Sequence, residues 1–540
     1  MMSKMKFLEK GSRVHWGECL VVAIVCVTAT AVAAAYLGQD INWDQRNYHL
    51  YVVYAWLTGR LWTDLAPAQI QTWFNPLPYL HNYLLIRYTR PVVAGAVTGA
   101  IAGIDGLLLW ILARQVFDGS REGVNRWCAG LVTVFGLTGS IFVSYLGRTF
   151  GECSPLVLAG LICATSAKGD MSESSRRFLA AGCCVGAACG LKLTNFVYAL
   201  GMAATLLVLW PFVRLRVSSL LMYAVGGAVG FIATGGYWAT KLWLAFGNPV
   251  FPFFNRFFQS PMYEPINVVD PDYLPASFVR AAVTYPFEWL LGIYKPSSPQ
   301  VFRDPRFALV AGLLPLAIIV ALLRSGKPRP SDGEVVNPAR ELNFWILSLF
   351  FVFSYLIWLN QFGVQRYVLT LELLTGVVLL LSLERLLQSA TEVSVVLGLL
   401  VIGSLLWTRA PDWSRMPYGA DWWGVPAVEE TASPTLYVMT GGKPMAYLIP
   451  YMPQADRFVR LGGNMPLEPN MPLGQRALSL MQAHTGPIRS LCVVAGDQEV
   501  ERLQRFGLRL QPDSCKTLQS LDYTFWTCAL DRMPPPLDAH

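Results

Sequence analysis

The chain has 540 residues, of which 54% are hydrophobic and only 14% are charged. A soluble protein needs about a quarter of its residues charged to cover its surface, so this composition excludes a chain built from ordinary soluble domains. The net charge of +7 comes from short basic clusters between apolar segments. Such clusters follow the positive-inside rule of membrane proteins and argue against a nucleic-acid partner.

Eleven apolar segments are candidates for spanning helices, because a helix in hydrocarbon satisfies its own backbone hydrogen bonds. They lie near residues 17–37, 91–114, 127–146, 154–168, 178–191, 194–213, 217–240, 306–324, 343–360, 366–383 and 392–408. The two segments beside Lys192 could instead form one helix, which would reverse the side of every later loop. Eleven spans place the basic clusters in the cytoplasm, so we favour a break at Lys192 and a cytoplasmic N-terminus.

This count predicts an α-helical, multi-pass protein of a bacterial inner membrane. Residues 1–408 form the expected membrane domain, with long outer loops at 38–90 and 241–305. Residues 409–540 alternate strand-like and helical segments, which predicts a small α/β domain in the periplasm. Cys515 and Cys528 of this tail could pair in an oxidising compartment or remain two free thiols.

The first outer loop opens with a dense group of titratable residues. Asp40, Asp44, Arg46 and His49 follow the first predicted span directly. A carboxylate at the edge of the bilayer can act as a general base, because desolvation raises its pKa toward neutrality. The alternative is that these residues only solvate a loop and anchor a helix in the membrane interface.

The sequence gives little support for a metal or cofactor site. His49 and His81 could join Asp44 and Glu152 at a metal, but no HxxxH or similar ligand spacing accompanies them. We therefore expect neither a metal nor another cofactor. The pair Gly441-Gly442 after a predicted strand resembles a phosphate-binding turn, although two glycines alone are a weak signal.

Several motifs, taken in chain order, resemble the glycosyltransferase-C (GT-C) superfamily. The acid after the first span and the segment 75–80 are similar to the first outer loop of lipid A aminoarabinose transferases and protein O-mannosyltransferases, with Asn75 in place of a proline. The segment 145–152 is similar to a second acidic site, with Glu152 where aspartate is usual. The segments 190–194 and 365–367 resemble later basic elements of these families.

The resemblance implies an inverting glycosyltransferase that uses a polyprenyl-phosphate-linked sugar. Asp44 would take the proton of the acceptor hydroxyl, with Asp40 as a rival, and Glu152 would orient the acceptor or support a cation. The expected donor-phosphate ligands are Arg46, Arg60, Arg148, Lys192 and Arg366, and the expected acceptor cleft contains Tyr48, His49, Asn75 and Tyr79. Lys192 could also be a simple interfacial lysine.

The acceptor would be a glycan, lipid or protein of the cell envelope. The loop 241–305 and the adjoining Arg306 carry several acids and bases, Asp304 among them. This region is expected to cover the cleft and bind acceptor, unless it is merely a solvated loop.

Two other classes of function use the same lipid carriers. A flippase or transporter would need internal repeats or charges midway through its helices, and the sequence has no clear repeat and one obvious mid-span acid, Asp105. A glycan polymerase or ligase would share the large outer loops. A labelled polyprenyl-phosphate sugar separates these classes, because a transferase breaks the sugar-phosphate bond and a flippase only moves the lipid.

Overall fold

The computed structural model describes residues 15–119, 121–149, 153–166, 171–213, 217–324, 338–426, 428, 432–493 and 496–533. The chain forms two compact units, each with its own hydrophobic core. Unit 1 consists of Met1–Leu37, Gly95–Gly236 and Val269–Trp413, and unit 2 consists of Gly38–Ala94, Tyr237–Val268 and Ser414–His540.

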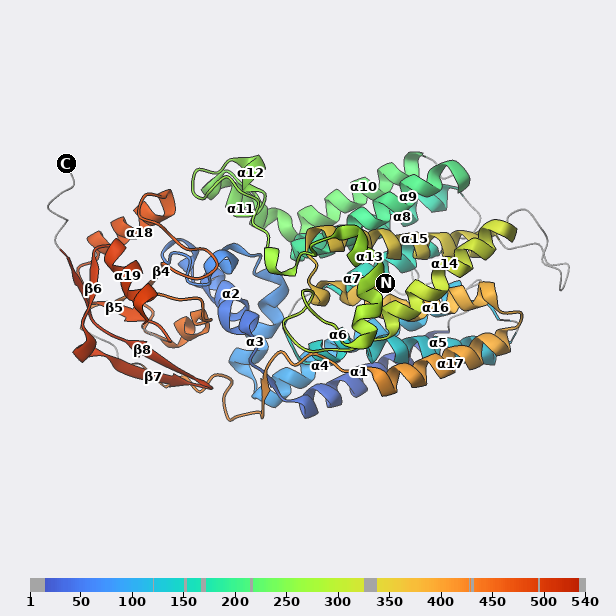
Figure 1. Cartoon of the computed structure of the whole chain (residues 1–540), viewed down its shortest axis with the longest axis horizontal. Helices are drawn as coiled ribbons and strands as arrows, with labels where there is room; N and C mark the ends of the chain where they lie inside the picture. Colours follow the sequence, from blue (N-terminus) through green and yellow to red (C-terminus); the bar gives the residue numbers. More distant parts are fainter. Residues whose placement is uncertain are drawn as a thin grey trace. The chain divides into compact units, whose positions relative to one another are not determined.

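Unit 1 is built from helices (Figure 1). They are α1 (Trp16–Leu37), α4 (Pro91–Val116), α5 (Glu122–Leu137), α6 (Ser140–Tyr145), α7 (Ser154–Thr165), α8 (Met171–Leu191), α9 (Phe196–Val213), α10 (Val217–Phe231), α13 (Phe278–Leu291), α14 (Arg306–Arg324), α15 (Pro338–Gln361), α16 (Leu369–Leu386) and α17 (Ala390–Trp407). Within the described residues, 8 helices of the chain are long and apolar enough to cross a membrane. The predicted class of α-helical multi-pass membrane protein is therefore confirmed.

Three of the eleven predicted spans do not reach this length or composition, although all three are helical. The segment 127–146 breaks between α5 and α6, and α7 has only 12 residues. α8 has 21 residues, but its first two turns are polar and charged. The chain separates α8 from α9 at Lys192, as predicted.

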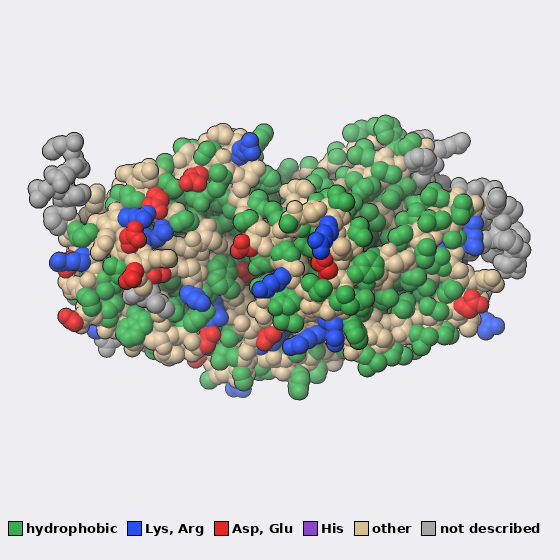
Figure 2. All heavy atoms as spheres, in the orientation of Figure 1, with side chains coloured by type: hydrophobic (Ala, Val, Ile, Leu, Met, Phe, Trp, Pro, Cys, Tyr) green, Lys and Arg blue, Asp and Glu red, His purple; other side chains and the backbone are tan. Residues whose placement is uncertain are grey.

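The outer faces of the long helices in unit 1 are apolar. Figure 2 shows hydrophobic side chains covering α9, α10 and α14 on the visible face. The large exposed hydrophobic residues of these three helices include Leu200, Leu207, Trp210, Leu221, Val225, Val229, Leu316, Ile319 and Leu322. An apolar surface of this extent is unstable in water, so lipid must cover it.

Glycines allow α8 and α10 to pack closely. Gly182 and Gly186 lie one turn apart on α8, and a Cβ on Gly186 would lie 2.1 Å from the carbonyl oxygen of Gly227. Only glycine permits this approach, which is a common way for helices to associate in lipid. This contact holds α8 in place, and Lys192 directly follows the end of α8.

A buried carboxylate holds the start of α6. Glu372 of α16 accepts hydrogen bonds from the backbone N–H groups of Ile141 and Phe142, both at 2.8 Å, and from the Ser140 hydroxyl at 3.1 Å. Its side chain is fully buried. A carboxylate at this position satisfies N–H groups that have no partner within the helix and lies at the positive end of the helix dipole.

Asp304 and Arg306 extend this network. Asp304 accepts a hydrogen bond from the backbone N–H of Ser140 at 2.9 Å and pairs with the Arg306 guanidinium at 3.2 Å. Arg306 also donates to the hydroxyls of Thr138 and Thr408, at 2.9 and 2.8 Å. Both charged side chains are buried. These two residues are therefore not part of a solvated loop, because the ion pair and its hydrogen bonds hold them within the helix packing.

Unit 2 combines short helices with strands (Figure 1). Its helices are α2 (Leu50–Leu57), α3 (Leu80–Tyr88), α11 (Tyr237–Phe246), α12 (Asn255–Phe258), α18 (Pro472–Ala483) and α19 (Asp497–Arg505). Its strands are β1 (Gln39–Asp40), β2 (Arg415–Met416), β3 (Leu436–Met439), β4 (Arg457–Arg460), β5 (Ile488–Leu491), β6 (Leu508–Leu510), β7 (Lys516–Ser520), β8 (Tyr523–Thr527) and β9 (Leu530–Arg532). The predicted strand-containing tail is confirmed.

The sheets of unit 2 are small. A parallel sheet has the order β4-β3-β5, and the pairs β1-β2, β6-β9 and β7-β8 are antiparallel. The first outer loop joins this unit, since Gln39 pairs with Met416 and Leu65 bridges Val459. From the sequence, we assigned this loop to the membrane domain, residues 1–408. Its backbone polar groups instead find hydrogen-bond partners in the tail.

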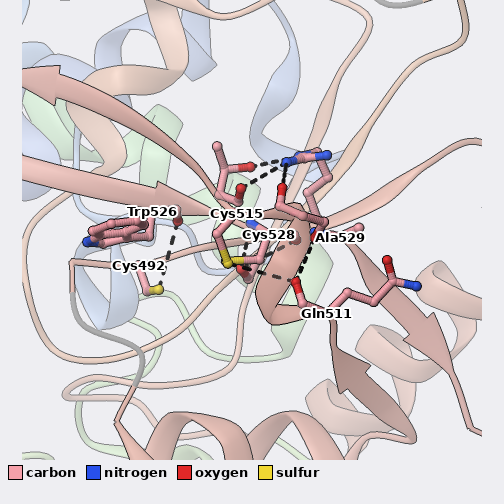
Figure 3. Close-up of a disulfide and its surroundings, with 10 residues drawn as sticks. Cys492, Gln511, Cys515, Trp526, Cys528 and Ala529 are labelled. Carbon is pink, nitrogen blue, oxygen red and sulfur yellow. Dashed lines mark hydrogen bonds between the residues drawn. A yellow bond between two sulfur atoms is a disulfide. The ribbon is translucent and has the colours of Figure 1, made fainter.

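A disulfide joins Cys515 and Cys528 in unit 2 (Figure 3). It ties the residue before β7 to the residue after β8. Cys492 is buried nearby, with its thiol 3.8 Å from the carbonyl oxygen of Trp526. Burial raises the pKa of the Cys492 thiol to about 11, so this thiol stays protonated at neutral pH.

We expect Arg306→Met to lower the apparent free energy of unfolding by about 3 to 5 kcal/mol, because it leaves the Asp304 carboxylate buried without its charged partner. Thermal unfolding of the purified protein in detergent measures this loss. Adding Asp304→Asn should recover part of it.

Arg303→Met is the matched control for this experiment. Arg303 is partly buried and lies over the Trp407 ring at 4.2 Å, without an acidic partner among the ion pairs of the described residues. Loss of the Arg303 charge should lower the free energy of unfolding much less. Equal stability of the two single variants would contradict the role given to the buried pair.

Candidate functional site

Three of the predicted donor-binding cations lie in unit 1, each beside the end of a helix. Arg148 follows α6, Lys192 lies between α8 and α9, and Arg366 precedes α16. Gly147 has a φ of +69°, a conformation that favours glycine, and the turn directs the N–H of Arg148 to the carbonyl oxygen of Tyr145 at 2.9 Å. Local backbone geometry thus positions each cation where a helix ends.

The ring of Tyr367 contacts two of these cations, Lys192 and Arg366. The Lys192 ammonium lies 5.5 Å from the centroid of the Tyr367 ring, and the Arg366 guanidinium lies 5.4 Å from the rings of both Tyr367 and Trp413. Arg148 is buried, with its guanidinium 3.9 Å from the carboxylate of Asp412. Contacts with aromatic rings hold a cation without cancelling its charge. We call Arg148, Lys192 and Arg366 the cation cluster.

Hydrogen bonds fix the turn that carries Arg366. The Tyr145 hydroxyl donates to the carbonyl oxygen of Arg366 at 3.1 Å, and the Tyr198 hydroxyl donates to that of Tyr367 at 2.7 Å. The Gln365 amide donates to the Ser140 hydroxyl at 3.4 Å, which connects the turn with the network around Glu372. Segments far apart in the sequence are thereby joined around the cluster.

The cation cluster lies at one end of α15 and α16, and ion pairs lie at the opposite end of the same helices. There Arg340 lies 3.8 Å from Glu384, and Arg385 lies 2.6 Å from Glu341. Both helices are long and apolar enough to cross a membrane.

The other two predicted donor ligands belong to unit 2, where Arg60 is held by the protein itself. Its Nε and Nη2 atoms each donate to the carboxylate of Asp64 at 2.9 Å, and it also bonds the carbonyl oxygens of Gln454 and Asp456. Burial lowers the pKa of Arg60, but the bonds with Asp64 more than offset this and raise it. These contacts give Arg60 a structural role.

Arg46 is also buried in unit 2. It donates to the carboxylate of Asp522 at 2.6 Å, and its guanidinium lies 4.4 Å from the centroid of the Tyr523 ring. Asp522 itself is half exposed. Arg46 thus keeps an aromatic and an acidic partner from the tail.

The two candidate acids of unit 2 differ in their surroundings. The carboxylate of Asp40 accepts hydrogen bonds from the backbone N–H of Asn42 at 3.1 Å and from its side-chain amide at 2.8 and 2.6 Å. Asp44 is 6% exposed and precedes the π-helical turn Gln45–His49, a form of helix that is frequent at functional sites. The bonds of Asp40 suit a structural role. The third acid, Glu152, lies outside the described residues.

The predicted acceptor residues come together in unit 2. The ring of His49 stacks on that of Tyr79 at 4.2 Å, and Tyr48 meets both rings edge to face at 4.3 and 5.5 Å. Asn75 accepts a hydrogen bond from the N–H of Leu77 at 3.0 Å and so starts the turn that carries Tyr79. The structure thus forms an aromatic group from two segments of the first outer loop.

Sequence reasoning missed several residues around the cation cluster. Asp412 and Trp413 lie after the last predicted span and carry no motif. Glu372 did leave a signal, because it is the only acid in the predicted span 366–383. An isolated carboxylate in an apolar segment should have prompted a search for buried donors.

Comparisons with known proteins are sparse. No family model and no curated protein matches the chain. Among solved structures, the chain is similar to ArnT from Cupriavidus metallidurans bound to undecaprenyl phosphate, with 12% identity, a TM-score of 0.46, and coverage of 95% of this chain and 97% of that one. The roles proposed below rest on this chain's own residues.

We expect Lys192→Met and Arg366→Met each to weaken binding of a polyprenyl phosphate by roughly 10- to 150-fold. Methionine keeps an unbranched apolar side chain and removes the charge, and a hydrogen bond to a charged group contributes about 1.5 to 3 kcal/mol. Titration of the purified protein with a fluorescent polyprenyl phosphate measures the affinity.

Lys241→Met is the matched control, because the Lys241 ammonium also lies over a tyrosine ring, that of Tyr237 at 5.6 Å, but belongs to unit 2. The affinity of the Lys241→Met variant for polyprenyl phosphate should stay near that of the unmodified chain. If Lys192→Met and Arg366→Met both bind as tightly as this control, the cluster does not hold a lipid phosphate.

Proposed function

We propose that this chain is a membrane glycosyltransferase of the GT-C type that uses a polyprenyl-phosphate-linked sugar. The observation that carries the proposal is the cation cluster at the ends of membrane-length helices. The phosphate of such a donor lies at the membrane surface while its chain lies in lipid. Lysine and arginine at helix ends are the side chains that can bind phosphate oxygens there.

Aromatic rings flank two cations of the cluster. Lys192 and Arg366 lie against tyrosine and tryptophan rings. Contact with an aromatic face leaves the charge of a cation in place, so a phosphate can bind beside these rings.

The proposed reaction is a single displacement at the anomeric carbon of the sugar. The acceptor oxygen bonds to this carbon while the bond from the carbon to the phosphate oxygen breaks, which inverts the configuration. Polyprenyl phosphate leaves with the electron pair, and the cation cluster stabilises its added negative charge. The carboxylate of Asp44 accepts the proton of the acceptor hydroxyl.

The residues that follow Asp44 are our candidates for binding an acceptor that carries a sugar. Tyr48 and His49 belong to the π-helical turn that follows Asp44, and Tyr79 stacks on His49. We assign these rings and Asn75 to acceptor binding, and we assign Glu152 to orienting the acceptor. Arg46 remains a second candidate for the phosphate. The acceptor is a glycan, lipid or protein of the cell envelope.

We place the reaction on the periplasmic side of a bacterial inner membrane, with the N-terminus in the cytoplasm. Two observations support this side. Arg340 and Arg385 lie at the helix ends opposite the cation cluster, in accord with positive charge on the cytoplasmic side. The disulfide between Cys515 and Cys528 suits an oxidising compartment for the tail.

We expect Asp44→Asn to reduce sugar transfer at least 100-fold, because general bases contribute about 10²- to 10⁴-fold and an amide cannot accept the proton. Release of labelled sugar from a polyprenyl-phosphate donor by the purified protein, with envelope extract as acceptor source, measures transfer. Donor affinity should stay near that of the unmodified chain.

Asp40→Asn is the matched control. It places an amide against the Asn42 amide, so we expect a loss of thermal stability and a much smaller loss of transfer by folded protein. Full activity of Asp44→Asn would remove Asp44 as the base. Movement of the lipid without any cleavage by the unmodified chain would replace the transferase with a flippase.

A further inference from the structure

In the parallel sheet of unit 2, the order in which the chain adds strands reverses at the central strand. β3 comes first in the chain but lies between β4 and β5. The connections therefore lead to one side of β3 and then to the other. In open parallel sheets, such a reversal leaves a crevice outside the carboxyl ends of the strands, and ligands bind there. The crevice is expected here between the ends of β3 and β5.

A pocket of about 430 Å³ lies at this place. Thr440 and Lys443 line it from the loop after β3, and Glu499 lines it from α19, which follows β5. The rings of Trp43 and Tyr523 complete the wall. All five residues belong to unit 2, and none belongs to the cation cluster.

The pocket is poorly suited to phosphate, although its loop contains Gly441 and Gly442. A Cβ on Gly441 would lie 3.2 Å from one carboxylate oxygen of Glu499, and a Cβ on Gly496 would lie 3.0 Å from the other. The carboxylate therefore lies against both glycine backbones, where a phosphate would otherwise sit. Like charges at this distance repel.

Hydrogen bonds from a buried arginine hold the loop after β3. The buried guanidinium of Arg460 donates to the carbonyl oxygens of Gly441 and Lys443, at 2.7 and 2.6 Å. Its third bond goes to the carbonyl oxygen of Pro67 at 3.1 Å. A pocket whose wall is braced in this way needs little reorganisation on binding.

The wall of the pocket has the chemistry that an uncharged sugar ring requires. Trp43 and Tyr523 are partly buried aromatic residues, whose electron-rich faces attract the C–H face of a sugar. Glu499 accepts hydrogen bonds, Lys443 donates them and Thr440 does both, so the hydroxyl groups around a ring find both kinds of partner. The volume falls within the range of about 300 to 1,000 Å³ that is usual for small-ligand sites.

We propose that this pocket binds an uncharged pyranose unit of a glycan. The residues that line it are not those of the cation cluster, and sugar binding here does not depend on the transferase activity. Trp43 directly precedes Asp44 in the chain, so a sugar held here contacts the neighbour of the proposed base.

Saturation-transfer NMR on the full chain in lipid nanodiscs tests the proposal, with the methyl glycosides of glucose, galactose, mannose and N-acetylglucosamine as probes. At least one glycoside should show contact with the unmodified chain. Glu499→Gln should weaken its affinity about tenfold or more, since this change replaces a charged acceptor. Thr440→Val should weaken it less and serves as a second variant that preserves side-chain shape.

Glu501→Gln is the matched control. Glu501 lies on the same helix, pairs with Arg505 at 2.7 Å and does not line the pocket, so its loss should leave sugar binding unchanged. Three results would overturn the proposal: no contact with any of the four glycosides, equal effects of the changes at 499 and 501, or tight binding of inorganic phosphate in competition with the sugar. A chain without transferase activity could still bind the glycosides, so this test is independent of the proposed reaction.

Discussion

The burial of Glu372 beside the Asp304–Arg306 pair is the constraint on which the arrangement of unit 1 depends. A charged group inside a membrane domain costs several kcal/mol unless its partners are complete. Here the carboxylate of Glu372 is satisfied only when α6 begins at Ser140 and lies against α16. The Ser140 hydroxyl also accepts a hydrogen bond from the side-chain amide of Gln365. The helix that leads to Arg148 and the turn that carries Arg366 are therefore positioned together.

Three arginines of the described residues are held within the fold. Arg306, Arg60 and Arg460 are buried and bonded to carboxylates or to backbone carbonyl oxygens. Burial lowers the pKa of Arg460 to about 9. Lys192 and Arg366 contact aromatic rings.

The length of apolar segments predicted most of the membrane helices, and the single Lys192 between two of them predicted the break that the structure contains. Strand-like alternation predicted the sheet of the tail, and the cysteine spacing allowed the observed disulfide. The sequence could not show that Tyr367 and Trp413 gather the cations, because those contacts join segments more than 40 residues apart. It also gave no reason to bury Asp304 and Arg306, whose hydrogen bonds depend on the packing of α5 and α17.

Photocrosslinking tests the central claim, that the cation cluster holds a lipid phosphate, most directly. A polyprenyl phosphate with a diazirine in its first isoprene unit should label peptides that contain residues 145–149, 190–195 and 363–368, and excess unlabelled polyprenyl phosphate should suppress the labelling. Labelling spread evenly along the apolar helices, or confined to the peptide around Arg60, would contradict the account.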